Sequence, residues 1–177
     1  MVAYYSFSRE QDTDDSYIYT FVTDSNSIYI VNFDVSGYKE YLEEHPLLLE
    51  HGYTLGIFRN SKSNADPRVR STVFKIIIDH FAIRGKESVI LYHCDIYDGK
   101  QRIRNALFDK WHKECESAKH FVKETLEVEI FDKDGCPVSF YIGFVTANNN
   151  PNLEKLRAEF EMFSVTMVAG ELNKNGL

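Results

Sequence analysis

The side chains best suited to chemistry lie together in one short stretch of the sequence, just after an unbroken apolar run. Residues 89–92 read Val-Ile-Leu-Tyr, which predicts a buried strand. Cys94, Asp95 and Asp98 follow this strand. A thiol can act as a nucleophile, and two carboxylates can hold a cation or share general acid–base work. Because open α/β sheets bind ligands beyond the carboxyl ends of their strands, these three residues are the catalytic candidates.

Each of these side chains also has a purely structural interpretation, which we favour. Asp98 is a natural N-cap, and Gln101 follows it at the spacing of a capping box. Asp95 would then accept hydrogen bonds from turn amides, and Cys94 would be a buried thiol. A metal would need a third carboxylate or histidine, and His93 is the one such residue close in sequence. We therefore predict no metal site.

A second group of polar residues lies at the start of a predicted helix, where Asp66 is the N-cap and Pro67 takes the first helical position. The residues of this group are Arg68, Arg70, Ser71 and Thr72. Backbone N–H groups at a helix N-terminus bind phosphate. Positively charged side chains are unfavourable there unless an anion or a carboxylate lies close enough to neutralise them. The pattern therefore predicts either a bound anion at this helix start or ion pairs with carboxylates of the protein itself.

Arg104 is a charged residue in an apolar setting. On the helix expected after Gly99, it falls inside the apolar arc that includes Trp111. A guanidinium in such a place needs a carboxylate or a stacked aromatic ring. We predict a buried ion pair with Asp95, because the strand end and the helix start face each other across a short turn. The helical pattern turns the other two possible partners, Asp79 and Asp109, towards solvent.

Composition bounds the class of protein. The 177 residues are 44% hydrophobic and 27% charged, which is typical of one globular domain. A formal net charge of -7 argues against a protein that coats nucleic acid. The sequence has no signal-peptide pattern and no apolar run long enough to span a membrane. Its three cysteines lie far apart, without disulfide or zinc spacing. These features favour a reduced, cytoplasmic monomer or simple homodimer.

The order of predicted elements favours a single α+β domain over residues 1–177. Residues 3–8 are predicted as a short strand, 9–16 as a loop, and 36–44 as a short helix stopped by Pro46. The remaining predicted elements are a hairpin (17–23 and 28–33), a strand (53–58), two helices (67–84 and 99–117) around strand 89–94, a hairpin at Asp134-Gly135, and a last helix from Pro151. The unit around helix 67–84 is a parallel βαβ crossover. We therefore predict a mixed, mostly antiparallel sheet with helices on both faces.

The central stretch resembles the signature of an uncharacterised bacterial family of small proteins, a domain of unknown function. The matching residues are Cys94-Asp95, Asp98-Gly99, Gln101, Arg104, Leu107-Phe108-Asp109 and Trp111. This resemblance implies kinship with that family and implies no activity.

The element order is also loosely similar to the GCN5-related N-acetyltransferase fold. In that family, small residues at the helix start that corresponds to Arg68–Val73 let the backbone bind the pyrophosphate of acetyl-CoA. Here Ser71 and Val73 replace the small residues at both of these positions. A tyrosine of the following helix is often the general acid, and Phe108 stands in its place.

Two functional hypotheses remain open. The first, which we favour, is a non-catalytic binding or interaction module without a cofactor, because the sequence contains no complete catalytic or metal-binding set. The second is an acyltransferase-like enzyme that binds CoA or a nucleotide phosphate at the helix N-terminus after Asp66-Pro67. The sequence leaves the ligand, the protein partner and any catalytic activity unassigned.

Overall fold

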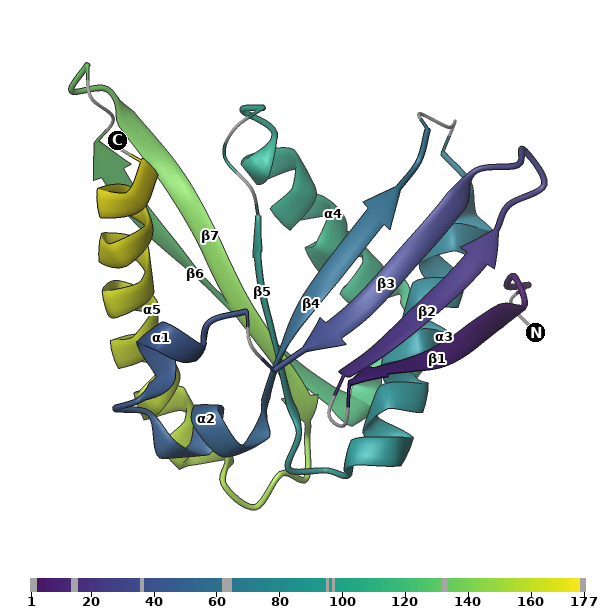
Figure 1. Ribbon diagram of the computed structural model, residues 1–177, viewed down its shortest axis with the longest axis horizontal. Helices are drawn as coiled ribbons and strands as arrows, with labels where there is room; N and C mark the ends of the chain where they lie inside the picture. The colour runs from purple at the N-terminus through teal and green to yellow at the C-terminus, as the bar shows by residue number, and fades with distance from the viewer. Residues whose placement is uncertain are drawn as a thin grey trace.

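Seven strands form one mixed sheet in the order β1-β2-β3-β4-β5-β7-β6 (Figure 1). The computed structural model describes residues 3–13, 16–35, 37–61, 65–94, 96, 98–131 and 134–175. In chain order the strands are β1 (Phe7–Thr13), β2 (Ser16–Val22), β3 (Ile28–Asp34), β4 (Gly52–Arg59), β5 (Val89–Cys94), β6 (Phe121–Phe131) and β7 (Pro137–Ala147). Only β4 and β5 pair in parallel in this described part, so the predicted α+β class with one parallel crossover is confirmed.

Helices cover the sheet on both faces. One face carries α3 (Pro67–Arg84) and α4 (Gln101–Glu114), and a short 3-10 helix (Glu116–His120) leads from α4 into β6. The other face carries α1 (Lys39–Leu42), α2 (Pro46–His51) and α5 (Leu153–Asn175). In Figure 1, α5 lies beside β6 and β7, whereas α3 lies behind β1 to β3.

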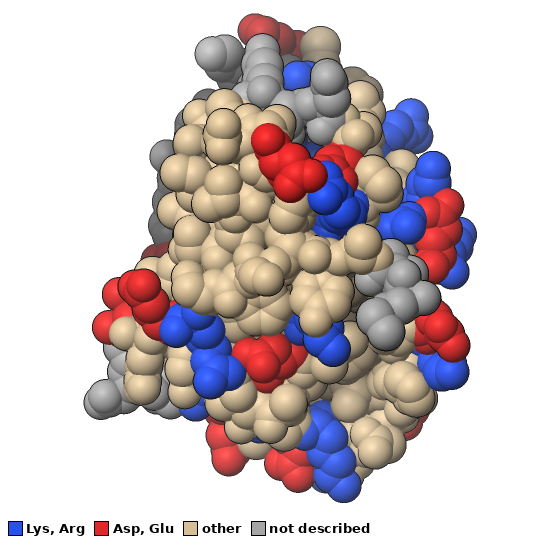
Figure 2. Space-filling view, turned by 90° about the vertical axis from the view of Figure 1, so that its right-hand side faces the viewer, with Lys and Arg blue, Asp and Glu red and all other residues tan. Residues whose placement is uncertain are grey.

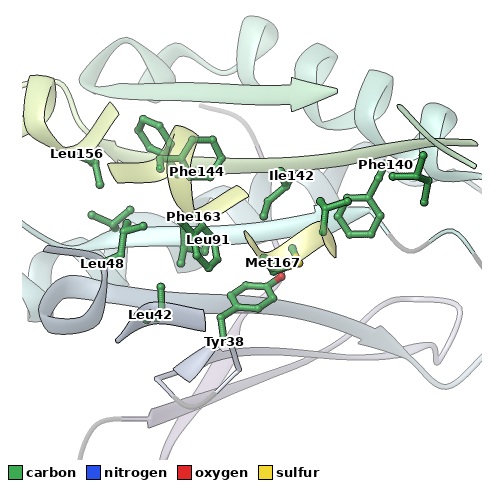
Figure 3. Packing of buried hydrophobic residues seen from close by; sticks show 14 residues of the cluster. Tyr38, Leu42, Leu48, Leu91, Phe140, Ile142, Phe144, Leu156, Phe163 and Met167 are labelled. Carbon is green, nitrogen blue, oxygen red and sulfur yellow. The ribbon is translucent and has the colours of Figure 1, made fainter. Parts of the chain in front are cut away.

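The first hydrophobic core lies between α5 and the β5-β7-β6 half of the sheet. Phe163 and Met167 of α5 are fully buried and face Leu91, Ile142 and Phe144 (Figure 3). The narrow apolar stripe that the sequence places on this last helix is therefore satisfied within the chain. Burying one side chain of this size contributes about 1.5–3 kcal/mol, so this core accounts for much of the stability of its half.

The second core is aromatic and lies between α3 and the β1-β4 half. Tyr19, Phe21 and Phe33 are buried on the inner face of the hairpin, against Val73 and Ile76 of α3. Tyr19 and Phe33 meet edge to face, with ring centroids 5.8 Å apart. Such pairs contribute about 0.5–1.5 kcal/mol beyond their buried area.

The outer face of this half is less covered. Four large apolar side chains of β2, β3 and β4 are 38–61% exposed there, namely Val22, Ile28, Ile30 and Phe58. Figure 2 views the molecule from the β1 side and shows charged residues mostly bordering a broad uncharged area.

The boundaries of α3 agree with the sequence prediction. The Asp66 carboxylate accepts a hydrogen bond from the Arg68 backbone N–H at 2.9 Å, and Pro67 takes the first helical position. Gly85 ends the helix with a φ of 84°, a conformation that a side chain disfavours. The hairpin from 17 to 33 and the turn at Gly135, whose φ is 75°, also lie where they are predicted.

One local prediction was wrong, and a second was incomplete. Residues 9–13 are not a loop, because they pair with β2 as part of β1. A strand at the edge of a sheet can expose polar side chains to water, so its apolar alternation is weak. Pro46 does not simply stop a helix, since it takes the first position of α2. Proline lacks only an N–H that this position does not use.

The parallel pair is short, and the sheet opens beyond it. Only Gly52 to Thr54 of β4 pair with Val89 to Leu91 of β5. Beyond this contact the two strands diverge, as Figure 1 shows, and α4 lies behind the opening.

Candidate functional site

A groove with a mixed lining lies between the start of α3 and the exposed side of α4. Its volume is about 630 Å³, within the range of small-molecule sites. Its lining residues are Tyr29, Ile57, Phe58, Arg59, Ala65, Asp66, Pro67, Val69, Arg70, Arg104, Leu107, Phe108, Lys110, Trp111 and Glu114. The groove thus joins an apolar floor to charged walls.

The walls of the groove are basic. Four cationic side chains, Arg59, Arg70, Arg104 and Lys110, line it against two carboxylates, Asp66 and Glu114. This excess stands out in a chain whose formal charge is -7.

An ion pair spans the groove. Arg70 of α3 pairs with Glu114 of α4, and Lys110 lies 3.9 Å from the same carboxylate. Arg59, at the end of β4, has no carboxylate partner among the described residues. The groove therefore offers at least one cation that a bound anion could reach without breaking an internal pair.

A second, smaller pocket of about 50 Å³ adjoins the groove. Ile57, Phe108 and Trp111 line both spaces, so the two pockets share these three side chains. Val73 and Ile77 of α3 complete its apolar wall. We call it the floor pocket. Its size and apolar lining suit one apolar group.

A buried lysine supports α4 beside the floor pocket. The side chain of Lys123 is 7% exposed, and its Nζ donates to Asp109 Oδ1 at 2.5 Å and to Thr125 Oγ1 at 2.8 Å. Burial opposes the charge, but Tyr92 and Asp109 outweigh it and raise the pKa of Lys123. The lysine therefore stays protonated and holds α4 to β6.

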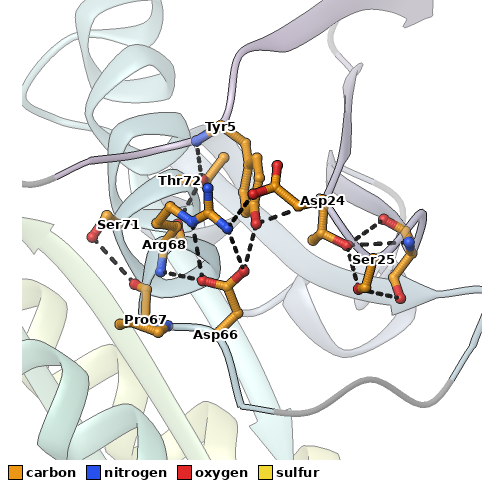
Figure 4. A network of polar contacts seen from close by, with 10 residues as sticks. Tyr5, Asp24, Ser25, Asp66, Pro67, Arg68, Ser71 and Thr72 are labelled. Carbon is orange, nitrogen blue, oxygen red and sulfur yellow. Dashed lines mark hydrogen bonds and ion pairs between the residues drawn. The ribbon is translucent and has the colours of Figure 1, made fainter.

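The predicted anion site after Asp66 is occupied by the protein's own carboxylates. Arg68 lies 2.6 Å from Asp24 and 3.3 Å from Asp66, and its guanidinium stacks 4.4 Å from the Tyr5 ring centroid (Figure 4). The Tyr5 hydroxyl donates to Asp66 at 2.5 Å. These hydrogen bonds raise the pKa of Arg68, chiefly through Asp24.

The hydroxyl groups predicted for the same site are used within the helix start. Thr72 Oγ1 donates to the Arg68 carbonyl at 2.7 Å and accepts from the Tyr5 N–H at 2.9 Å. Ser71 Oγ donates to the Pro67 carbonyl at 3.3 Å. Of the predicted set, Arg70 alone lines the groove.

Of the three candidates at the end of β5, the structure describes Cys94 and Asp98. Cys94 is fully buried, and burial raises the pKa of its thiol to about 11, so it is almost entirely protonated at neutral pH. Asp95 lies outside the described residues. Asp98 does not cap α4 directly, because the helix begins at Gln101 and Asp98 accepts instead from the Lys100 N–H at 3.1 Å.

Arg104 forms a two-pronged ion pair with Asp98, whereas its predicted partner, Asp95, is not described. The guanidinium donates to Asp98 Oδ1 at 2.7 Å and to Oδ2 at 2.6 Å. The side chains are 38% and 43% exposed, so this pair is half-exposed. The hydrogen bonds from Arg104 lower the pKa of Asp98.

We expect this ion pair to contribute little to stability. A double-mutant cycle on Arg104→Met and Asp98→Leu should give a coupling of about 1 kcal/mol or less, because water screens partly exposed pairs. Urea unfolding of the four proteins measures it. A coupling near 3 kcal/mol would mean that the pair is effectively buried and would contradict this view.

Sequence reasoning missed the groove because its walls come from three distant segments. Arg59 and Glu114 carry no local motif, and the pairing of Glu114 with Arg70 across the fold cannot be read from spacing. One signal was available. Ile103 and Leu107 are 68% and 41% exposed, and they continue to Trp111 as an apolar stripe on a helix with no fully buried residue.

Neither a metal cluster nor a membrane span is found in the part of the chain that the structure describes. No three His, Cys, Asp or Glu side chains among these residues could jointly hold a metal ion. No described helix combines the length and apolar character needed to cross a membrane.

Comparison with known proteins places the chain in a family without assigning an activity. No curated protein and no solved structure matches it significantly. The resemblance to the acetyltransferase fold therefore stays a prediction from element order. Residues 65–162 match the model of a family of unknown function (DUF6169), which is more than half of the 177-residue chain. This match spans α3, α4 and most of the groove, and the chain belongs to that family.

Proposed function

We propose that the protein is a non-catalytic binding module and that its binding site is the groove between α3 and α4. The observation that carries the proposal is the combination of an apolar floor with basic walls in an otherwise acidic chain. Ligand sites are typically apolar clefts with a few placed polar groups. This groove fits that description.

Two further observations favour binding over catalysis. Lys123, which lines the floor pocket, pairs with Asp109, and the Cys94 thiol is protonated, whereas the buried Nε2 of His112 in the same lining has no hydrogen-bond partner among the described residues. The predicted catalytic carboxylate Asp98 is paired with Arg104. A general base must be free to accept a proton near a substrate.

The acyltransferase-like alternative keeps one supporting observation. The divergence of β4 from β5 opens beside the start of α3, which is where the loosely similar fold would bind CoA. Against it, Arg68 is paired with Asp24 and Asp66. CoA and ATP therefore belong among the probes of the groove.

The single tryptophan makes the binding proposal directly testable. Trp111 lines both the groove and the floor pocket, and its indole N–H gives the one tryptophan side-chain signal in an NMR spectrum. We expect small aryl and alkyl compounds from a mixed fragment set to shift this signal. Leu107→Glu, which places a charge in the groove lining, should weaken the shifts.

The matched control is Met162→Glu on α5, which is 60% exposed and lies on the opposite face of the sheet. It should leave the shifts unchanged. Fragments that bind without disturbing Trp111 would place the site elsewhere and end the proposal. Conversion of CoA thioesters or ATP to products would show that the protein is an enzyme and would contradict the binding-module proposal.

A further inference from the structure

We propose that the natural occupant of the groove is an acidic, amphipathic segment of a protein partner, lying along α4 with one apolar side chain in the floor pocket. This inference rests on the proposed function, because it names the class of partner for the same groove.

The spacing of the basic groups argues for an extended occupant. Arg104 lies near the start of α4, and Arg70 pairs with Glu114 at the end of α4. A helix rises by about 1.5 Å per residue, so these two positions lie about 15 Å apart along α4. One carboxylate or phosphate hydrogen-bonds over about 2.7–2.9 Å and cannot contact both ends. A chain that carries several carboxylates can.

The apolar surface also continues beyond the groove. Leu107 and Trp111 line the groove, and Ile103, one turn earlier on the same face of α4, is 68% exposed outside the lining. A small molecule confined to the groove would leave Ile103 in water. An amphipathic segment covers such a stripe with apolar residues at helical spacing, a known mode of peptide recognition.

The dimensions set the length of this segment. About 15 Å corresponds to about ten residues of helix or about five residues of extended chain. The floor pocket of about 50 Å³ accepts the end of one apolar side chain, as the central anchor of an interface does. Arg59 would pair with one carboxylate of the segment, and further carboxylates would compete with Asp98 and Glu114 for the cations that these two residues hold.

Charge complementarity determines the sign of the charge on the partner segment. Four cations and two carboxylates line the groove, whereas the whole chain is acidic. An acidic segment is repelled by most of the surface and attracted by this one place, which gives specificity of location. Such binding should weaken as salt rises, because exposed charges are screened.

The test is a selection from a display library of random peptides long enough to fill the groove as a helix. The full chain is the target, and peptides that also bind the Leu107→Glu variant are removed. We expect the recovered peptides to be acidic, with apolar residues three or four positions apart. In fluorescence anisotropy, a recovered peptide should lose about tenfold or more in affinity on Arg59→Ser combined with Arg70→Ser.

The matched control is Val165→Glu on α5, which is 64% exposed and away from the groove, and it should bind the peptide like the parent. Recovered peptides that are basic or neutral, or that keep their affinity on Arg59→Ser combined with Arg70→Ser, would overturn the inference. Finding no groove-specific peptide would do the same. If fragments still shift Trp111 in that case, the groove remains a binding site, but for a small molecule.

Discussion

Stability should fall steeply as the pH drops from about 6.5 towards 3, and His80 should be the main cause. His80 is 1% exposed, with its ring 4.1 Å from the Phe33 ring centroid and its Nε2 2.9 Å from Ser88 Oγ. Burial, assisted by the positive charge of Arg84, lowers the pKa of His80 from 6.5 to about 3, although Asp79 acts in the opposite sense.

The direction follows from proton linkage. Between these two pKa values the unfolded chain holds a proton on His80 and the folded chain does not, so acid favours unfolding. The contribution is complete above pH 6.5 and is lost as the pH falls through this window. One such group changes the free energy of unfolding by about 1.4 kcal/mol per pH unit. Urea unfolding at pH 7, 6, 5 and 4 measures the slope.

His80→Gln removes the titration and keeps a hydrogen-bonding side chain near Ser88, so it should flatten most of the slope above pH 4. His120→Gln is the matched control, because His120 is exposed, and it should leave the slope as it was. Below pH 4, loss of the carboxylates with lowered pKa, such as Asp66, adds to the decline. An unchanged slope in His80→Gln would show that another group is responsible.

Removing Asp109 should destabilise the protein by about 3 kcal/mol, the cost of leaving a buried charge without its partner. Lys123 is the group left behind, since its side chain is 7% exposed and Asp109 is its ion-pair partner at 2.5 Å. Asp109 itself is 43% exposed, so water reaching Lys123 from that side sets this cost at the low end. Urea unfolding of Asp109→Leu at neutral pH measures the loss.

Two comparisons separate this effect from ordinary surface electrostatics. The double variant Asp109→Leu with Lys123→Met removes both charges and should recover most of the lost stability. Glu154→Ala breaks an exposed pair with Arg157, whose acidic member is 83% exposed, and should cost about 0.5 kcal/mol or less. If Asp109→Leu costs no more than Glu154→Ala, Lys123 is solvated in solution.

The sequence predicted those parts of the fold whose signals are local. Asp66, Pro67 and Gly85 mark the ends of α3 because an N-cap, a first-turn proline and a C-terminal glycine each act within a few residues. His80 lies on the buried side of α3, within its apolar stripe, and hydrogen-bonds Ser88. Pro46 misled because the same residue both ends and begins helices.

The candidate site was largely out of reach of sequence reasoning. Arg68 is notable in the sequence for its unfavourable position at a helix start. Its ion-pair partner Asp24 lies 44 positions earlier, and nothing in the sequence indicates that the two are close in the fold. The groove likewise depends on Glu114 meeting Arg70 across the fold. Such pairings arise from how distant elements pack in the fold, which no residue pattern encodes locally.

The two outer strands of the sheet also restrict how the molecule can associate. β1 and β6 have open backbone edges, which are templates for strand addition and aggregation. β1 carries Arg9, Glu10 and Asp12, and β6 carries Glu127 and Glu129 near its far end. Charged side chains along an edge oppose the docking of another flat strand. Association through backbone hydrogen bonding at these edges is therefore disfavoured, and a partner would be held by its side chains.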